Sequence, residues 1–140
     1  MDTTNGRSQM EHLSELARKT FWGYVGCELE YMDESKVIVS LEVQEHHLNL
    51  IGILHGGVHT TLLDSAMGIM AMSARLGEDV VTSNMNIHFT SPVRLGKVTV
   101  VAEILHKSGR MITTQGSLRN ENDTLCSLAT ASFRVIEQNS

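Results

Sequence analysis

The alternation of apolar and polar residues predicts a short helix, two strands, a long apolar helix and four further strands, in that order. Apolar residues recur at spacings of three and four between positions 10 and 17, which is typical of an amphipathic helix. Residues 21–23 end this helix. The runs with strand-forming residues, separated by turn residues, are 24–32, 36–43, 80–89, 97–106, 110–119 and 124–136. We expect residues 1–8 to be a disordered tail and residues 9–140 to form a single domain.

The segment 57–76 is apolar on nearly every side. Sequential strands joined by short turns form an antiparallel sheet, and one face of such a sheet must be covered by another element. No other segment is both long enough and apolar enough to cover it. The pattern therefore predicts an α+β fold in which an antiparallel sheet curves around one central helix.

Composition narrows the class of protein. The chain has 140 residues, 41% of them hydrophobic and 19% charged, which fits one soluble domain. The net charge of −5 argues against a nucleic-acid partner. Three polar residues, His59, Asp64 and Ser73, interrupt the long helix, which favours a core helix over a membrane span. The N-terminus lacks an apolar signal core, so we expect a cytoplasmic protein whose Cys27 and Cys126 are free buried thiols.

Asp64 lies inside this apolar helix, where a buried carboxylate is costly unless it is satisfied or used. It could be exposed at an edge, could bind a partner subunit as a structural acceptor, or could be a catalytic base or nucleophile. Gly68 follows one turn later, at a cost of roughly 1 kcal/mol relative to alanine. A glycine there allows close approach of either a ligand or the sheet.

The sequence His55-Gly56-Gly57 precedes the helix directly. The first N–H groups of a helix have no partner within it, and glycine leaves them unshielded. Such groups bind anions and developing oxyanions, and the helix dipole adds to the effect. An oxyanion site followed by Asp64 in the same helix favours the catalytic interpretation.

At this point the residues resemble a known family. Asn49 lies six residues before His55, and Asp64 lies nine residues after it. This spacing is similar to the signature of hotdog-fold acyl-CoA thioesterases, most of all the phenylacetate-pathway (PaaI-type) and thioesterase superfamily member 2 types. The resemblance continues through residues 81–87 and 91–96 and covers roughly residues 20–136.

The resemblance implies a hotdog fold, with six antiparallel strands wrapped around one long central helix. It also implies a homodimer joined edge to edge, often paired again into a homotetramer, with active sites between subunits. The Gly56 N–H would polarise the thioester carbonyl, and Asp64 would attack it or activate water. Asn49 would hold the leaving sulfur or the water, His55 would orient the loop, and Thr82 would position water. The reaction would convert aryl- or medium- to long-chain acyl-CoA into free acid and coenzyme A (CoA).

Further substrate contacts are expected on the same basis. The residues predicted to contact substrate are Gly57, Gly68, Ser83, Met67 and Met85. A second set flanks the predicted turns and forms either a solvated rim or a patch that binds the nucleotide phosphates of CoA: Arg94, Lys97, Lys107 and Arg110.

Other functions are less well supported. His55 and His59 have the spacing of metal ligands on a helix, but His59 and Asp64 lie about 140° apart around its axis. We therefore expect no metal, and no cofactor apart from CoA as part of the substrate. A non-catalytic acyl-CoA-binding hotdog module and a hotdog hydratase are the alternatives to the thioesterase.

Overall fold

The computed structural model describes the backbone of residues 3–137 and the side chains of residues 8–137. Three helices and one short 3-10 helix, η1, accompany six strands in this part of the chain. The helical elements are α1 (Thr3–Arg18), α2 (Phe21–Val25), η1 (Glu45–His47) and α3 (Gly56–Ala74). The strands are β1 (Glu28–Met32), β2 (Val37–Val43), β3 (Asp79–Phe89), β4 (Gly96–Ser108), β5 (Met111–Arg119) and β6 (Leu125–Ile136).

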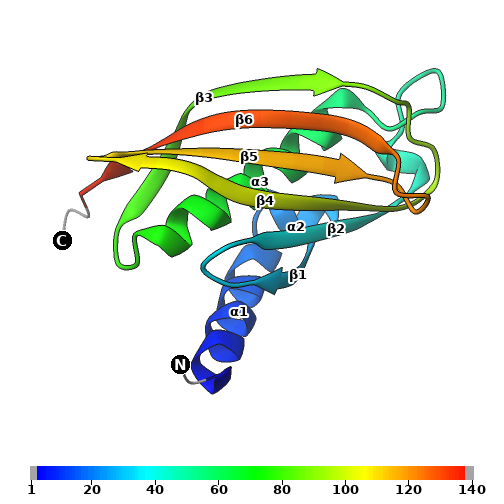
Figure 1. Cartoon of the computed structure of the whole chain (residues 1–140). Coiled ribbons are helices and arrows are strands. Elements are labelled where there is room, and N and C mark those ends of the chain that lie inside the picture. Colours follow the sequence, from blue (N-terminus) through cyan, green and yellow to red (C-terminus); the bar gives the residue numbers. More distant parts are fainter. Residues whose placement is uncertain (1–2, 138–140) are drawn as a thin grey trace.

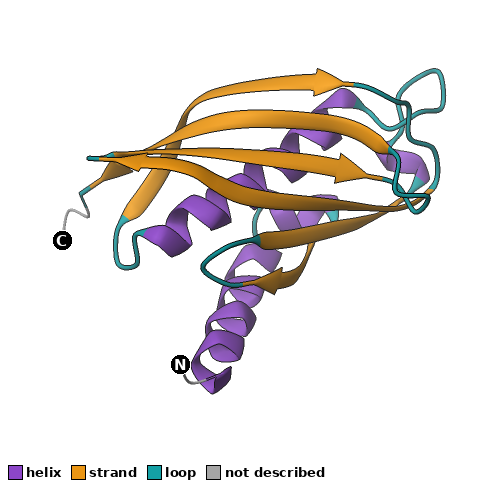
Figure 2. Ribbon diagram, viewed as in Figure 1, coloured by secondary structure: helices purple, strands orange, loops and turns teal. Residues whose placement is uncertain are grey.

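The six strands form one antiparallel sheet in the order β1-β2-β4-β5-β6-β3. The sheet arches over α3, and β1 and β3 form its two edges (Figures 1 and 2). Helix α3 contacts five of the strands, β2 to β6. The predicted hotdog arrangement is therefore confirmed. No helix in the described residues is long and apolar enough to cross a membrane.

The core lies between α3 and the concave face of the sheet. Leu63, Met67 and Met70 of α3 have no exposed surface, and Phe133 of β6 is almost as completely buried. Helix and sheet approach each other closely at Gly116 of β5. A Cβ atom added there would lie 3.2 Å from Leu63 Cδ2 and 3.3 Å from Met67 Cγ. Such tight packing means that α3 is held rigidly against the sheet.

The N-terminal region differs from the prediction. Helix α1 begins at Thr3, within the stretch 1–8 that was predicted to be a disordered tail, and residues 1–2 lie outside the described part. The helix is anchored because Leu13 packs against the core and α1 contacts α2. α1 then extends away from the sheet beyond β1 (Figure 1).

The strand predicted from residue 24 begins only at Glu28. Residues 21–25 form α2 instead, and Gly26 ends it with φ +98° while its N–H donates to the Trp22 carbonyl. A left-handed residue at this position is a common helix stop, and glycine adopts it without strain. Cys27 and Cys126 are free and buried, as predicted.

Strand β3 matters most for the site. It pairs with β6 along one edge, and no described strand pairs with its other edge. A bulge between Thr82 and Asn84 interrupts its register with β6. Thr82 faces α3 on the concave side, because its hydroxyl group contacts Asp64.

Candidate active site

The N-terminus of α3 presents one free donor. His55 is the N-cap residue, and its Nδ1 accepts a hydrogen bond of 2.8 Å from the Gly57 N–H. The N–H groups of Val58 and His59 donate to the His55 carbonyl at 2.9 and 3.3 Å. Among the described residues no acceptor binds the Gly56 N–H. Gly56 is therefore the donor that remains for a ligand.

The second glycine has a different role from the one predicted. A Cβ atom on Gly57 would lie 3.0 Å from His55 Nδ1, so glycine is needed for the imidazole to lie over the first turn. Because the Gly57 N–H already binds His55, the expected substrate contact through this N–H is not available in the structure. His55 thus holds the loop and the helix start in place.

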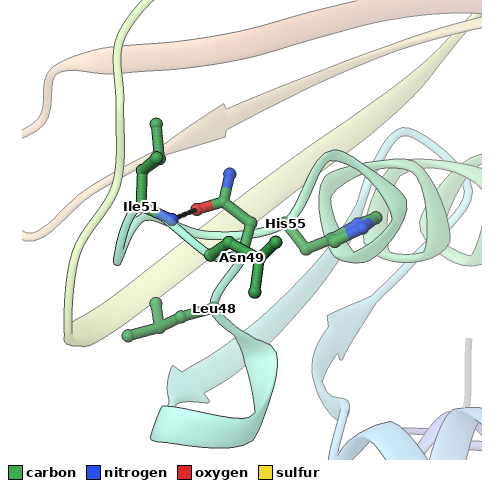
Figure 3. A pocket seen from close by; sticks show the side chains of 5 residues that line it. Leu48, Asn49, Ile51 and His55 are labelled. Carbon is green, nitrogen blue, oxygen red and sulfur yellow. Dashed lines mark hydrogen bonds between the residues drawn. The ribbon is translucent and has the colours of Figure 1, made fainter.

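Asn49 shapes the loop that precedes α3. Its Oδ1 accepts hydrogen bonds from the N–H groups of Ile51 at 3.1 Å and Ile53 at 3.2 Å. In Figure 3 the amide nitrogen of Asn49 points away from Ile51. Residues 48–51 and His55 line a hollow of about 530 Å³, which we call the Asn49 pocket. The Asn49 amide group therefore retains its N–H donors for a ligand.

His47 supports this loop through its imidazole ring and its backbone carbonyl. The sequence did not predict this role. It exposes 4% of its surface, and its Nδ1 accepts from the Gln44 N–H at 2.9 Å. Its Nε2 therefore carries the proton and donates to the Val25 carbonyl at 2.6 Å. The His47 carbonyl in turn accepts the His55 N–H at 2.9 Å. No pattern in the sequence distinguishes His47 from the exposed His46 beside it.

Asp64 and Thr82 form the second group of the site. The Thr82 hydroxyl donates to Asp64 Oδ1 at 2.8 Å, so the structure brings this predicted pair together. Asp64 is half-buried rather than fully buried, and no described residue donates to its Oδ2. The carboxylate is thus held by one oxygen and open at the other.

These two groups lie apart within one chain. Gly56 and Asp64 are both on α3, separated by eight residues, or about 12 Å along the helix axis. A single thioester carbonyl cannot contact both groups over this distance. One chain therefore presents two partial sites, one at Gly56 with Asn49 and His55, the other at Asp64 with Thr82.

The other predicted substrate contacts fall into different environments. Gly68 faces the ring of Phe133, where an added Cβ would lie at 3.5 Å, so it serves helix–sheet packing. Met67 is fully buried in the core of the single chain, and its expected substrate contact stays a prediction. Ser83 is exposed at the bulge of β3, and Met85 is half-buried on the same strand.

The predicted cations do not form one patch. Arg94 and Lys97 lie at the start of β4, and Lys97 is 3.3 Å from a carboxylate oxygen of Glu30. Lys107 and Arg110 lie at the other end of the same strand, roughly 33 Å away at the rise of an extended chain. Within a single chain, β4 therefore separates the predicted phosphate-binding set into two halves, Arg94 with Lys97 and Lys107 with Arg110.

A second hollow lies near Gly56, beyond the ring of Phe89. Residues 53–54 and 89–92 line it together with His59, and its volume is about 310 Å³; we call it the His59 pocket. His59 exposes 3% of its surface, and its Nδ1 lies 2.7 Å from Ser127 Oγ. The Phe89 ring packs edge-on against the imidazole, with centroids 5.2 Å apart. The same ring would lie 3.4 Å from a Cβ atom added to Gly56.

Burial controls the charge of this histidine. Desolvation lowers the pKa of His59 from 6.5 to about 4, so the imidazole is neutral at pH 7. Sequence reasoning considered His59 only as a metal ligand. Within the described residues, no cluster of three potential metal ligands occurs.

Comparisons with known proteins find similar thioesterases and esterases. A human protein named acyl-coenzyme A thioesterase 13 is 34% identical over 87 residues, which cover 61% of this chain and 62% of that protein, less than two thirds of its length. A putative esterase of Haemophilus influenzae is 29% identical over 129 residues, 91% of this chain and 93% of the esterase.

A crystal structure of a Haemophilus influenzae thioesterase superposes with a TM-score of 0.87 at 26% identity, covering 91% of this chain and 90% of that one. The family model described as "Thioesterase superfamily" matches residues 51–127. That segment includes His55, Gly56, Asp64 and Thr82, together with most of the sheet. Since the match spans more than half of the chain, the protein belongs to the thioesterase superfamily.

Proposed function

We propose that this protein hydrolyses acyl-CoA thioesters to the free acid and CoA, in active sites that two copies of the chain share. The observation that carries the proposal is the division of the site along α3. The unpartnered Gly56 N–H and the Asp64–Thr82 pair are the two groups that the reaction needs, and about 12 Å of rigid helix separates them. The name of the human relative supports acyl-CoA as the substrate class.

The free edge of β3 offers the way to join the two partial sites. Gly56 lies beside Phe89, the last residue of β3, whereas Asp64 lies beside Thr82, near its beginning. If two β3 edges pair antiparallel about a twofold axis, the end of one strand lies next to the beginning of the other. Gly56 of one chain would then approach Asp64 of the partner subunit. The same pairing would cover an edge that otherwise invites aggregation. Further pairing into a tetramer stays a prediction.

The chemistry follows from the two groups. The Gly56 N–H, at the positive end of α3, donates to the thioester oxygen as negative charge develops there. Asp64 removes a proton from water while the water oxygen adds to the carbonyl carbon, or attacks that carbon directly. The C–S bond then breaks and CoA leaves as a thiolate, which takes up a proton. After direct attack the acyl group is joined to Asp64 as an anhydride, and water hydrolyses it to release the free acid and restore the carboxylate. The Asn49 amide can donate to the departing sulfur, and the thioester needs no metal because it is already an activated acyl donor.

The separated cations acquire a role in the same dimer. The Arg94 end of β4 lies beside the start of α3, because the Val93 carbonyl accepts a hydrogen bond of 2.7 Å from the Leu54 N–H. The end with Lys107 and Arg110 lies beside the last turn of α3, since Arg75 donates to the Gly109 carbonyl at 3.0 Å. Antiparallel pairing of the two β3 strands would bring the Arg94 end of β4 in one chain toward the opposite end of β4 in the partner subunit. Both pairs could then bind the phosphates of one CoA molecule.

Replacement of the carboxylate tests the activity. Asp64→Asn should lower the rate of thiol release from an acyl-CoA panel by at least about 10²-fold, the usual scale for a general base. Glu103→Gln removes an exposed carboxylate of β4 and should leave the rate unchanged. Near-normal turnover in Asp64→Asn would refute the assignment. CoA binding without thiol release by the unaltered protein would indicate a binding module instead.

Mixed dimers test the shared site. Asp64→Asn and Asn49→Ala chains should each be inactive alone. In a heterodimer, one composite site receives both altered residues and the other receives neither, so activity returns. Random mixing should restore about a quarter of the normal activity, since about half of the dimers are mixed and each has one intact site. If Asp64 and Asn49 of the same chain formed the site, mixing would restore nothing.

A further inference from the structure

The His59 pocket contains a donor whose direction the hydrogen bonds determine. The Ser127 hydroxyl has no exposed surface, and His59 Nδ1 at 2.7 Å is its only partner among the described side chains and backbone groups. A buried hydroxyl group needs an acceptor for its proton. The Ser127 hydroxyl therefore donates to Nδ1, and the proton of the neutral imidazole resides on Nε2.

The Nε2–H group is left for a ligand. It makes no hydrogen bond to a described residue, although 97% of the histidine surface is buried, the complement of the 3% that is exposed. Because the pocket opens onto His59, a group that enters it can accept this proton. Leu54, Phe89 and Pro92 provide apolar walls beside this donor. A few directed polar groups in an apolar hollow are typical of a site that orients a ligand.

The pocket is also close to the reacting position. His59 follows Gly56 by three residues, or about 4.5 Å along the axis of α3. The Phe89 ring contacts both residues, so it forms a common wall between the Gly56 N–H and the His59 pocket. In a substrate whose carbonyl oxygen accepts from the Gly56 N–H, the atoms a few bonds from that carbonyl would lie against the Phe89 ring.

We propose that the His59 pocket is a substrate subsite that binds an acceptor oxygen a few bonds from the thioester carbon, through the His59 Nε2–H. This inference rests on the proposed thioesterase function. Two parts of the substrate can supply such an oxygen: a hydroxyl or keto group on the acyl chain, or the first amide carbonyl of the pantetheine arm. Either oxygen would fix the orientation of the thioester relative to Gly56.

The test compares matched substrates with His59→Phe, which keeps an aromatic ring and removes the donor. The substrates are a saturated acyl-CoA, the 3-hydroxyacyl-CoA of the same length, and saturated acyl thioesters of N-acetylcysteamine and of ethanethiol, which lacks the amide. If the acyl group supplies the oxygen, the unaltered protein should prefer the 3-hydroxy substrate by about tenfold in kcat/KM, and His59→Phe should abolish the preference. If pantetheine supplies it, His59→Phe should lower kcat/KM about tenfold for the CoA and N-acetylcysteamine thioesters and spare the ethanethiol ester.

Other results overturn the inference. Equal losses on all four thioesters would mean that His59 only supports the fold, and no loss on any of them would mean that the donor is unused. His12→Phe, at an exposed position of α1, controls for the substitution itself. If the unaltered protein hydrolyses none of the thioesters, the proposed function fails rather than the subsite alone.

A second measurement does not depend on a folded variant. In the unaltered protein with ¹⁵N-labelled histidine, the imidazole nitrogen spectrum should show His59 protonated on Nε2 and not on Nδ1. A saturating thioether analogue of the favoured acyl-CoA should then shift the Nε2 resonance. A proton on Nδ1, or an unchanged Nε2 resonance, would overturn the inference.

Discussion

Acidification should unfold this protein partly through one buried histidine. Desolvation lowers the pKa of His59 from 6.5 to about 4 in the folded chain, whereas an unfolded chain exposes the imidazole to water. Between these two values the unfolded state binds more protons than the folded state. The free energy of unfolding therefore decreases as the pH falls from 6.5 to 4, and the decrease is complete below about pH 4.

The magnitude follows from the size of the shift. A pKa difference of about 2.5 units at 1.36 kcal/mol per unit corresponds to roughly 3 kcal/mol of stability lost. This is a large part of the 5–15 kcal/mol that stabilises a typical domain. Asp33 is a second group that makes stability depend on pH. Hydrogen bonds from Tyr31 and the Lys36 N–H hold the pKa of its carboxyl group well below the usual range. The Asp33 carboxyl group is exposed. Its contribution to the stability of the fold is present above its unfolded pKa near 3.8 and is lost only at lower pH, so it is separate from the contribution of His59.

Urea unfolding followed by circular dichroism between pH 7.5 and 4.5 measures the effect, at one protein concentration so that association does not vary. His59→Gln can still accept a hydrogen bond from Ser127 but does not titrate. The unaltered protein should lose roughly 2.5 kcal/mol more than His59→Gln across this range. His88→Gln, at an exposed position of β3, should follow the unaltered protein. Parallel curves for the unaltered protein and His59→Gln would refute the role of burial.

Three glycine substitutions separate packing from function. Gly68→Ala adds a methyl group in ordinary contact with the sheet, so the free energy of urea unfolding should stay constant or rise by up to about 1 kcal/mol. Gly116→Ala places a methyl group 3.3 Å from Met67 Cγ and should lower the melting temperature, at a cost of about 1–3 kcal/mol; an unchanged value would mean that Met67 moves freely. Gly57→Ala should displace the His55 ring, cost about 1 kcal/mol as a lost N-cap, and lower kcat/KM for acyl-CoA, whereas normal kinetics would mean that the cap does not position Gly56.

The main architecture was predictable because its signals are long and local. Segment 57–76 is too apolar to lie at a surface, and the four strands after it alternate over many residues. The short α2 was not predictable. Tyr24 and Val25 favour strands, and only the left-handed Gly26 and the packing of Trp22 against the core select the helix.

The predictability of the site divides in the same way. Asn49, His55, Gly56 and Asp64 lie within one short segment, so their spacing in the sequence carries information. The contacts of the two buried histidines join residues far apart in the chain. The partner of His47 Nε2 lies 22 residues away, and the hydroxyl that binds the His59 Nδ1 lies 68 residues away. No local pattern records such a pair, and only the fold brings it together.

The rigidity of α3 determines how the site can work. The helix is packed on five strands, and its inward side chains Leu62, Leu63 and Met70 have no exposed surface. The distance between Gly56 and Asp64 therefore cannot shorten by a motion within one chain without breaking the core. A loop closure that unites the two groups would have to move the helix itself. In the proposed mechanism, association of two chains is the route that leaves the core intact, and activity would then depend on the surface along β3 as much as on Asp64 and Gly56.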